Sequence, residues 1–334
     1  MHPDQRPFFV SSDTVRSVFK WGDAIRALQS AYSRDIAPQS APPRSVAAAG
    51  KTWLRTLSAV PVDGRYYGAK IMGAAMGSAC PAVEYLIVLF DRETSRIAGL
   101  VDGALVTGYR TAATSAAALD RLAPAGKARL AVLGSGLEAS MHVRAIAQVR
   151  ELSEVLVYSP TPEKRAAFAE AVTRELGVPA RGVASGQAAV DGAGLVLCAA
   201  RARGEQPTLY GDWLQPEVSI VSIGSTVPSQ REIDVSVVER ADLIVCDMLD
   251  EVREETGDMI AAREAGIAFH DKCHAMVDLM SGRLDAALPG ARARMFKSVG
   301  GGLQDIVVAE QILARALEQG VATPLPIAFD HKIL

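Results

Sequence analysis

The alternation of apolar and polar residues divides the chain into two parts with different patterns. In the first part, strand-like runs carry charged residues among apolar ones, as in TWLRTLSAVP (52–61), RYYGAKIMG (65–73) and AVEYLIVLFD (82–91). These runs predict the strands of a sheet that carries charged residues among apolar ones. From residue 128 onward, short continuous β-branched runs alternate with helical segments, which predicts a parallel sheet covered by helices on both faces.

Helical periodicity accompanies the first sheet. We expect one helix over 13–32, with Asp23 as a candidate cap, and a packed helix rich in small residues over 107–122. A hairpin at 91–103 leads into the strand that precedes this second helix. The first part is therefore interpreted as an α+β domain that ends at the turn PAGK (124–127).

The second part alternates strands and helices in a regular order. Its predicted strands lie in ARLAVLGSG (128–136), EVLVYSP (154–160), a short run near Ala180, GLVLCAA (194–200), VSIVSIG (218–224) and ADLIVCD (241–247). Predicted helices follow the first two strands, at 138–150 and 163–176. After Met295 we expect a loop that runs into an amphipathic helix, and we expect this last helix to return to the first domain.

Length and composition narrow the class of protein. The chain has 334 residues, 49% hydrophobic and 22% charged, which is enough for two domains with substantial cores. The formal charge of −3 and the scattered basic residues argue against nucleic acid as a partner. Apolar runs are shorter than the roughly 20 residues that span a bilayer, and the N-terminal residues do not resemble a signal peptide. We therefore expect a cytoplasmic protein without a membrane partner, whose cysteines are free thiols: Cys80, Cys198, Cys246 and Cys273.

The strongest local signal is LAVLGSGLEA (130–139), which follows a predicted strand and opens a predicted helix. In this GxGxxA pattern, the first glycine permits a tight turn, the second lets a pyrophosphate approach the backbone, and the alanine allows close packing. The helix N-terminus offers N–H groups to the phosphates. A purely structural turn is the alternative. The residues expected at the cofactor are Gly134, Ser135, Gly136, Leu137, Glu138 and Ala139.

The end of the following strand indicates which dinucleotide is bound. An acid at this position favours NAD, whereas hydroxyl and basic residues suit the 2′-phosphate of NADP. The sequence VYSPTPEKR (157–165) offers Ser159, Thr161 and Lys164 and has no acid at the strand end. NADP is therefore slightly favoured over NAD, although the basic residues could simply solvate the start of a helix.

These segments resemble the ornithine cyclodeaminase/mu-crystallin family, as do GAKIMG around Lys70, GLVDGALVTGYRTAATSAAA (99–118) and MFKSVGGGLQDIVVAEQIL (295–313). The resemblance covers nearly the whole chain. It implies an α/β fold in which a Rossmann-type NAD(P)-binding domain (123–305) is inserted into an α+β substrate-binding and dimerisation domain (1–122 plus about 306–334). It also implies an NAD(P)-dependent homodimer that acts on a small α-amino or α-imino acid.

A substrate of that class carries a carboxylate, which calls for fixed cationic donors. Arg44, Lys70 and Arg110 lie where the family places its carboxylate-binding cations, and Arg55 is a weaker candidate for the same role. Lys70 interrupts an apolar strand pattern, and it could also exchange a proton with an imine nitrogen. Without the resemblance, Lys70 could equally be a surface lysine and Arg110 a structural ion-pair partner.

The sequence departs from the cyclodeaminases in the loop GSTVPSQRE (224–232). Cyclodeaminases carry an aspartate in this loop, and Thr226 stands at the matching position. A threonine supplies neither the charge nor the basicity that a distal amine needs. The nearby Asp234 is interpreted as a helix cap. This departure favours a reductase over a cyclodeaminase.

Further polar residues are candidates for cofactor contacts or for helix capping. Thr114, Ser298 and Gly300 are further candidate cofactor contacts, although the segment 297–302 could instead be a flexible hinge. Asp305 is interpreted as a cap or first-turn acid of the last helix.

Two groups of polar residues are not assigned to a site. We expect no metal site, because His270 and His274 have no evident third ligand. The acidic run 247–258 is interpreted as a solvated helix face.

The leading hypothesis is an NAD(P)H-dependent reductase of a small α-imino acid such as pyrroline-2-carboxylate, or the reverse amino-acid dehydrogenase. Arg44 and Arg110 would fix the carboxylate, while Lys70 would bind it or supply a proton. Two alternatives remain: an ornithine cyclodeaminase-type ammonia lyase that uses catalytic NAD, and a non-catalytic, mu-crystallin-like binding protein.

Overall fold

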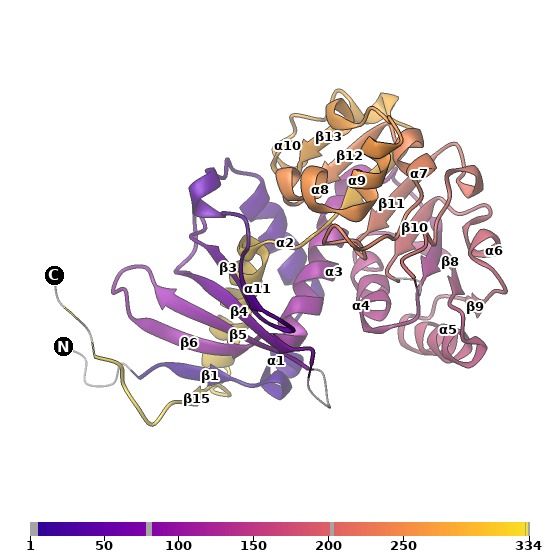
Figure 1. Cartoon of the computed structure of the whole chain (residues 1–334). Helices are drawn as coiled ribbons and strands as arrows, with labels where there is room; N and C mark the ends of the chain where they lie inside the picture. Colours follow the sequence, from indigo (N-terminus) through magenta and orange to yellow (C-terminus); the bar gives the residue numbers. More distant parts are fainter. Residues whose placement is uncertain (1–5, 78–81, 201–203, 331, 333–334) are drawn as a thin grey trace. The chain divides into compact units, whose positions relative to one another are not determined.

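A computed structural model describes residues 6–77, 82–200, 204–330 and 332. The chain forms two compact units (Figure 1). Unit 1 combines Met1–Arg110 with Gly301–Leu334, and unit 2 consists of Thr111–Gly300. The division falls inside α3 (Gly103–Leu122), the helix rich in small residues that the sequence predicts from residue 107. The C-terminal helix α11 (Gly302–Glu318) belongs to unit 1.

Unit 1 is built on a mixed seven-stranded sheet with the order β15-β1-β6-β5-β4-β3-β2. Strand β1 pairs with β6 in parallel, and every other neighbouring pair is antiparallel. The predicted runs at 52–61, 65–73 and 82–91 all form strands. The strands are β1 (Phe8–Val10), β2 (Ser45–Ala49), β3 (Thr52–Ala59), β4 (Tyr66–Ala75), β5 (Val83–Asp91), β6 (Ile97–Asp102) and β15 (Thr323–Pro324).

The predicted single helix over 13–32 is wrong. The structure has two helices, α1 (Ser12–Val18) and α2 (Trp21–Tyr32), separated by extended backbone at Phe19 and Lys20. The side chain of Ser11 caps α1 by accepting from the N–H of Thr14, whereas Asp23 lies in the first turn of α2 and is not a cap. The two helices are amphipathic and follow each other directly, so their apolar residues were interpreted as the periodicity of a single helix.

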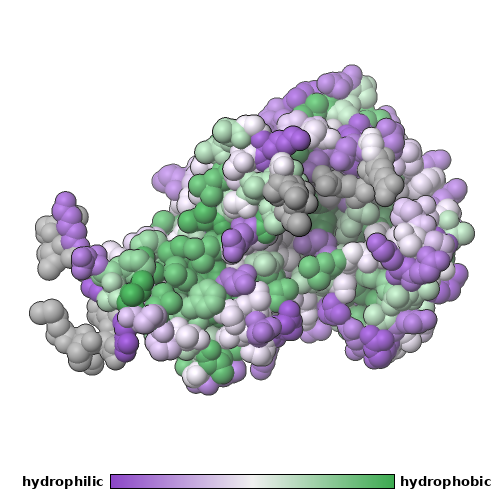
Figure 2. Space-filling view, turned by 60° about the horizontal axis from the view of Figure 1, so that its bottom comes forward, coloured by the Kyte–Doolittle hydropathy of each residue, from purple (hydrophilic) through white to green (hydrophobic). Residues whose placement is uncertain are grey.

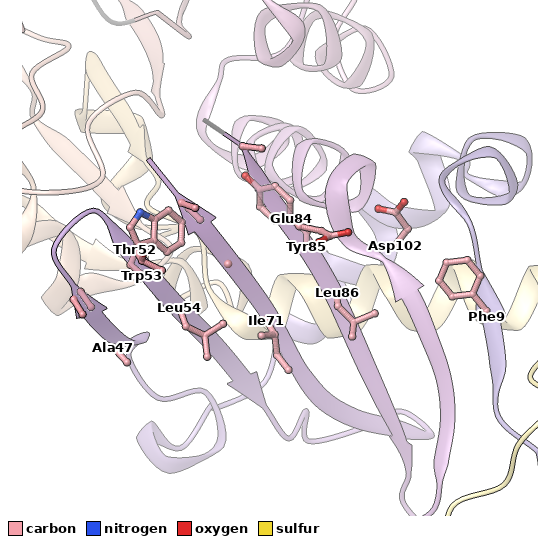
Figure 3. Close-up of a pocket in the computed structure, with 16 residues that line it drawn as sticks. Phe9, Ala47, Thr52, Trp53, Leu54, Ile71, Glu84, Tyr85, Leu86 and Asp102 are labelled. Carbon is pink, nitrogen blue, oxygen red and sulfur yellow. The ribbon is translucent and has the colours of Figure 1, made fainter. Parts of the chain in front are cut away.

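The two faces of the unit 1 sheet have different surroundings. Helix α11 packs against β3, β4, β5 and β6, and it also contacts α1 and α2. On the open face, Leu54, Ile71 and Leu86 project from neighbouring strands (Figure 3). They line a hollow of about 1060 Å³, and Figure 2 shows hydrophobic side chains gathered on the surface of unit 1.

Unit 2 is built on an eight-stranded parallel sheet with the order β13-β12-β14-β11-β10-β7-β8-β9. Strand order reverses at the neighbours β7 and β10, as in Rossmann-type domains, which bind ligands at this switch point. The strands are β7 (Ala128–Leu133), β8 (Leu152–Tyr158), β9 (Ala180–Gly182), β10 (Leu195–Cys198), β11 (Val218–Ser222), β12 (Leu243–Cys246), β13 (Cys273–Ala275) and β14 (Ala293–Lys297).

Strand β14 corrects the prediction that a loop begins after Met295. The segment Ala293–Lys297 is a buried inner strand, paired with both β11 and β12. The arginine and lysine of this segment make its sequence unlike that of a buried strand. In the structure both charged side chains have hydrogen-bond partners inside the domain. The N–H of Ser298 continues the pairing by donating to the carbonyl of Ser222.

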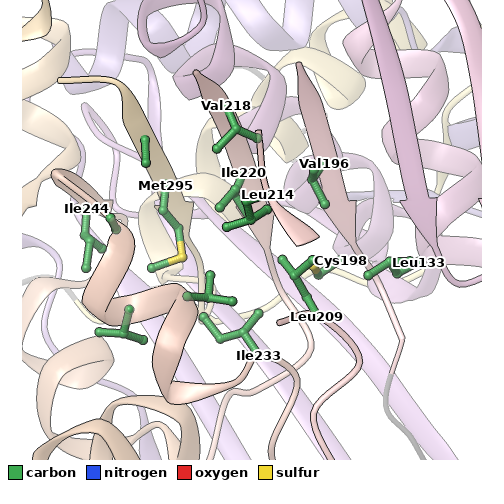
Figure 4. Close-up of a cluster of buried hydrophobic side chains, with 14 of the residues drawn as sticks. Leu133, Val196, Cys198, Leu209, Leu214, Val218, Ile220, Ile233, Ile244 and Met295 are labelled. Atoms are coloured by element: carbon green, nitrogen blue, oxygen red, sulfur yellow. The ribbon is translucent and has the colours of Figure 1, made fainter. Parts of the chain in front are cut away.

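Helices cover the unit 2 sheet and enclose its core. The hydrophobic cluster in Figure 4 includes Leu133, Val196, Ile220 and Met295, which come from adjacent strands of the sheet. Ile233 and residues of the α7 and α9 helices complete it. The helices are α4 (Leu137–Ile146), α5 (Pro162–Leu176), α6 (Gly186–Val190), α7 (Val235–Arg240), α8 (Leu249–Glu255), α9 (Gly257–Glu264) and α10 (Met276–Met280).

Three other sequence predictions can be compared with the described residues. No helix in the described ranges has the length and apolar character needed to cross a bilayer. Cys198, Cys246 and Cys273 are buried free thiols, while Cys80 lies outside the described residues. Among the residues described, no group of three or more histidine, cysteine or acidic side chains has an arrangement that could hold a metal ion.

Candidate functional site

The glycine turn after β7 is built from backbone contacts that require glycine. Gly134 has a φ of +122°, and a Cβ there would lie 2.5 Å from the carbonyl oxygen of Ala199. Its N–H donates to the carbonyl of Tyr158 at the end of β8. The turn therefore lies at the carboxyl ends of β7, β8 and β10, which is the switch point of the sheet.

The residues after Gly134 leave space at the start of α4. Gly136 is the N-cap of α4, and a Cβ added to it would meet nothing within 4 Å. Leu137 is exposed and Glu138 half-buried, whereas Ala139 is fully buried against the sheet. An open glycine at a helix N-terminus suits an anion such as a pyrophosphate. The predicted cofactor segment is thus a tight turn with open backbone at a helix N-terminus.

The end of β8 is tied to this turn. Ser135 donates from its hydroxyl to the Ser159 hydroxyl at 2.9 Å. Thr161 is the N-cap of α5, and Lys164 is exposed in its first turn. Arg165 donates to the carbonyl of Ser159 at 2.9 Å. The strand end therefore presents hydroxyl and basic groups beside the glycine turn.

In unit 1, Lys70 and Arg110 share one buried carboxylate. The Lys70 Nζ and the Arg110 Nε each lie 2.9 Å from Asp305 Oδ1. Arg110 also donates to Gln304 Oε1 at 2.8 Å, and the Gln304 amide donates to the Tyr32 hydroxyl at 3.1 Å. We call Lys70, Arg110, Asp305 and Gln304 the cation cluster. Asp305 is a first-turn acid of α11, as predicted, but it is fully buried and organises both cations.

The cation cluster changes the acidity of Lys70. Burial lowers the pKa of Lys70 from its usual 10.5 to about 8. The Asp305 carboxylate opposes this shift, and the positive charges of Arg110 and Arg55 add to it. A lysine with a pKa near neutrality can both hold an anion and exchange a proton.

Strand register places Arg44 and Arg55 on the same sheet face as Lys70. Leu57 pairs with Lys70 across β3 and β4, so Arg55, two residues earlier on β3, points to the same face. Arg55 is half-buried, and its guanidinium lies 5.2 Å from the centre of the Trp53 ring. Arg44 precedes β2 and continues its register, in which Val46 pairs with Arg55. The four cations predicted from the sequence therefore belong to one unit.

Unit 2 contains a second buried lysine. The Lys297 Nζ lies 2.9 Å from Asp258 Oδ2 and 3.0 Å from the Ser222 hydroxyl, which donates to Glu232 at 2.7 Å. Burial disfavours the Lys297 ammonium, but the Asp258 and Glu232 carboxylates outweigh it and raise its pKa. Burial also raises the pKa of Glu232, to about 7. We call Lys297, Asp258, Glu232 and Ser222 the strand-end network.

The interpretation of the acidic run 247–258 as a solvated face holds for only part of the run, since the acids at 250, 254 and 255 are exposed. Asp247, Glu251 and Asp258 are all buried. Asp258 accepts from the N–H groups of Glu232 and Ile233, and Asp247 accepts from Ser298 and from the N–H of Gly300. These carboxylates satisfy backbone donors inside the domain, which local sequence pattern does not reveal.

The remaining predicted residues lie in four places. Thr226 follows β11, and its N–H and hydroxyl both donate to Gln230 Oε1 at 3.0 Å. Ser298 and Gly300 follow β14 and are held by Asp247. Thr114 is fully buried in α3. Asp234 caps α7 by accepting from the N–H of Ser236, as predicted.

Several buried polar residues gave no strong signal in the sequence. Gln304 and Asp305 were visible only as a polar pair at the start of an amphipathic helix, and Glu232 as one of several loop residues. His142 was not singled out, yet it is fully buried in α4 and its Nε2 lies 3.1 Å from the Ser115 hydroxyl. The available signal was a charged or polar residue within an otherwise apolar stretch, as at Lys297 in MFKSV.

Comparisons with known proteins agree with this architecture. The model of the ornithine cyclodeaminase/mu-crystallin family matches residues 10–320. A Delta(1)-pyrroline-2-carboxylate reductase of Bacillus cereus is 29% identical over 237 residues, which cover 71% of this chain and 72% of the relative. The ketimine reductase mu-crystallin of Rattus norvegicus is 29% identical over 235 residues, 70% of each chain.

A solved structure resembles the whole chain. The Delta(1)-pyrroline-2-carboxylate reductase of Thermococcus litoralis, in complex with NADH and L-proline, has a TM-score of 0.84 at 23% identity. The match covers 95% of this chain and 100% of that one. The predicted fold class, a Rossmann-type domain inserted into an α+β domain, is confirmed. Because the family model spans nearly the entire chain, this protein belongs to the ornithine cyclodeaminase/mu-crystallin family.

Proposed function

We propose that this protein is an NAD(P)H-dependent reductase of a small α-imino acid, or the reverse amino-acid dehydrogenase. The observation that carries the proposal is the cation cluster, in which two buried cations share the single carboxylate of Asp305. Such a pair retains positive charge for a substrate carboxylate. The coarser prediction, an NAD(P)-dependent oxidoreductase acting on C=N bonds, is confirmed by the relatives, which are reductases of this kind.

The side chains of the cation cluster supply binding and a proton. Arg110 offers a planar guanidinium, oriented by Gln304 and Asp305, for paired hydrogen bonds to the carboxylate of the imino acid. Arg44 adds a further cation on the same face. When bound, a nicotinamide would supply the hydride that the imine carbon needs. Lys70, with a pKa of about 8, donates the proton that the imine nitrogen requires, so that the product is the amino acid.

The cofactor proposed for unit 2 is NADP in preference to NAD. The pyrophosphate would lie over Gly134, Ser135 and Gly136, at the start of α4. The hydroxyl and basic groups around Ser159, Thr161 and Lys164 suit a 2′-phosphate better than a ribose hydroxyl. Thr114, Ser298 and Gly300 are proposed as further contacts.

A cyclodeaminase remains the second candidate function. Thr226 disfavours it, because the hydroxyl and N–H of this residue are both directed to Gln230 and the loop position carries no acid. Neither group can act as a base towards a distal amine.

We also propose a homodimer that forms through unit 1. The open face of the sheet supports this, since exposed apolar side chains such as Leu54 border its hollow. Apolar faces of this extent are typical of protein interfaces.

The experiment that tests the function is a cofactor-oxidation screen with purified protein. NADPH and NADH are each offered with pyrroline-2-carboxylate, piperideine-2-carboxylate, or a 2-oxo acid with ammonia. We expect oxidation with at least one imine, and faster at limiting NADPH than at limiting NADH. If every imine is inert while L-ornithine releases ammonia without net change of cofactor, the protein is a cyclodeaminase. Cofactor binding without any turnover would support the binding protein.

A further inference from the structure

The start of α11 lies against the strands that carry Lys70. A Cβ added to Gly302 would lie 2.4 Å from the carbonyl oxygen of Ser58 on β3. The backbone of the helix therefore approaches β3 more closely than any residue with a side chain would allow. Ser58 follows Leu57, which pairs with Lys70 on β4. This close approach places the first turn of α11 within reach of Lys70.

Asp305, in that first turn, contacts two cations through a single oxygen. Its Oδ1 lies 2.9 Å from the Lys70 Nζ and 2.9 Å from the Arg110 Nε. Its Oδ2 is buried and accepts no hydrogen bond from the described residues. An acid that served to cap the helix would accept a backbone N–H of the first turn. The carboxylate of Asp305 is therefore directed to the two cations and not to the end of its own helix.

The charged groups that act on Lys70 come from three elements: Asp305 on α11, Arg110 on α3 and Arg55 on β3. Burial has the largest influence and lowers the pKa of Lys70, as do the two arginines, whereas Asp305 raises it. Lys70 is 1% exposed and Asp305 is fully buried, so salt and water screen their attraction little. Asp305 is thus the group that favours a proton on Lys70.

We propose that Asp305 is a positioning residue, which through one shared oxygen holds the Lys70 ammonium as a proton donor beside the Arg110 guanidinium. This inference rests on the proposed reductase function and adds the residue that prepares the proton donor of that site. Reduction of the C=N bond adds a hydride from NAD(P)H to carbon and the proton of Lys70 to nitrogen, which leaves Lys70 as a neutral amine. Asp305 then favours the return of a proton from water to that amine before the next turnover.

The test measures the protonation of Lys70 directly, by NMR of the full chain labelled with ¹³C at the ε-carbon of lysine. The Lys70 signal is identified by its absence from Lys70→Met. In the wild type it should titrate near pH 8. In Asp305→Asn it should titrate at least about one pH unit lower, because an adjacent opposite charge is lost. Lys297, which contacts Asp258, is the internal control, and its signal should be the same in both proteins.

Arg110→Met tests the shared oxygen in the opposite direction. It leaves Asp305 in contact with Lys70 and removes a neighbouring positive charge, so Lys70 should titrate at higher pH than in the wild type. Because Lys70 keeps its carboxylate partner, this variant remains informative if Asp305→Asn does not fold. Asp305→Glu retains the carboxylate and should return the titration of Lys70 towards the wild-type pH.

The pH profile of imine reduction separates positioning from a purely structural role. At pH 9, kcat/KM of Asp305→Asn should be at least about tenfold below the wild type, since each pH unit of displacement corresponds to a factor of ten. Below the pH at which Lys70 titrates in the variant, most of that loss should be recovered. The control is Asp13→Asn, which removes a negative charge from an exposed residue of α1 and should leave the profile unchanged.

Two results would overturn the proposal while leaving the reductase function intact. One is an identical titration of Lys70 in the wild type, Asp305→Asn and Arg110→Met. The other is a loss of kcat/KM in Asp305→Asn that is the same at every pH, which would make Asp305 a structural residue. If no imine oxidises the cofactor at all, the reductase function itself fails, and the NMR titration still decides whether Asp305 acts on Lys70.

Discussion

The two units each bury a lysine against an aspartate, and the two lysines differ in the charges around them. Lys70 in unit 1 shares Asp305 with Arg110, and its pKa is lowered to about 8. Lys297 in unit 2 faces Asp258 and Glu232, and its pKa is raised. Arg231 lies 3.4 Å from Asp258. The group around Lys297 therefore contains two cations, Lys297 and Arg231, and two carboxylates.

The cation cluster is therefore suited to accept an anion, whereas the charges of the strand-end network neutralise one another. The strand-end network also binds backbone groups, since Glu232 accepts from the N–H of Gly224 and Asp258 from the N–H of Glu232. It therefore holds the loop that carries Thr226. In the cation cluster, Lys70 and Arg110 both contact the one carboxylate of Asp305, an arrangement that suits the carboxylate site proposed above. Burial alone does not distinguish the two roles, whereas the charge balance does.

The largest effect expected from this comparison is on catalysis by Lys70→Met. We expect kcat/KM for the imino acid to fall about 1000-fold, because both a cationic contact and the proton donor are lost. The free energy of unfolding should change by less than about 1.5 kcal/mol, because Asp305 keeps its contact with Arg110. Cofactor oxidation and chemical denaturation measure the two quantities. Lys51→Met, at an exposed turn, is the matched control, and near-normal turnover in Lys70→Met would contradict the proposed role.

Lys297→Met should have the opposite effect to Lys70→Met. Its main consequence should be a lower free energy of unfolding. Removing the ammonium leaves the buried Asp258 carboxylate without its nearest cation, which costs about 3 to 5 kcal/mol. Denaturant unfolding measures the loss, and the double variant Lys297→Met with Asp258→Asn should recover part of it. An unchanged unfolding free energy would show that the strand-end network is not internally neutralised as described.

The next effect is a pH dependence of stability that arises from Glu232. Its pKa is about 7 in the folded protein, against 4.5 for an ordinary glutamate. The folded state therefore binds more protons between pH 4.5 and 7, and the contribution of this group to stability falls as pH rises through that window. The total is up to about 3 kcal/mol. Glu232→Gln should remove this part of the slope in denaturation at several pH values, and an identical slope in the variant would argue against it.

The smallest effect concerns the rate of imine reduction as a function of pH. Lys70 loses its proton above its pKa of about 8, so kcat/KM should decline by about tenfold per pH unit beyond that point. Lys70→Arg keeps the charge but not the exchangeable proton, and its profile should be low and flat. A wild-type profile that stays level above pH 8 would exclude Lys70 as the proton donor.

Local features of the fold were predictable from sequence because they depend on neighbouring residues. The β4 and β5 runs and the turn at Gly134 follow from periodicity and from the backbone freedom of glycine. The break between α1 and α2 was missed because both segments are amphipathic in succession. Strand β14 was missed because Arg294 and Lys297 are charged, and charged residues are not expected in a buried strand. Only the hydrogen-bond partners in the structure explain why these two side chains lie in such a strand.

The sequence by itself determined the glycine turn after β7, the alternating order of unit 2 and the identity of the candidate cations. Only the tertiary structure decided which carboxylate those cations share. Lys70 and Asp305 are 235 positions apart, and they meet because unit 1 is assembled from both ends of the chain. Local pattern reports the exposure and period of a residue, but the charge balance of a buried site depends on contacts that chain topology alone creates.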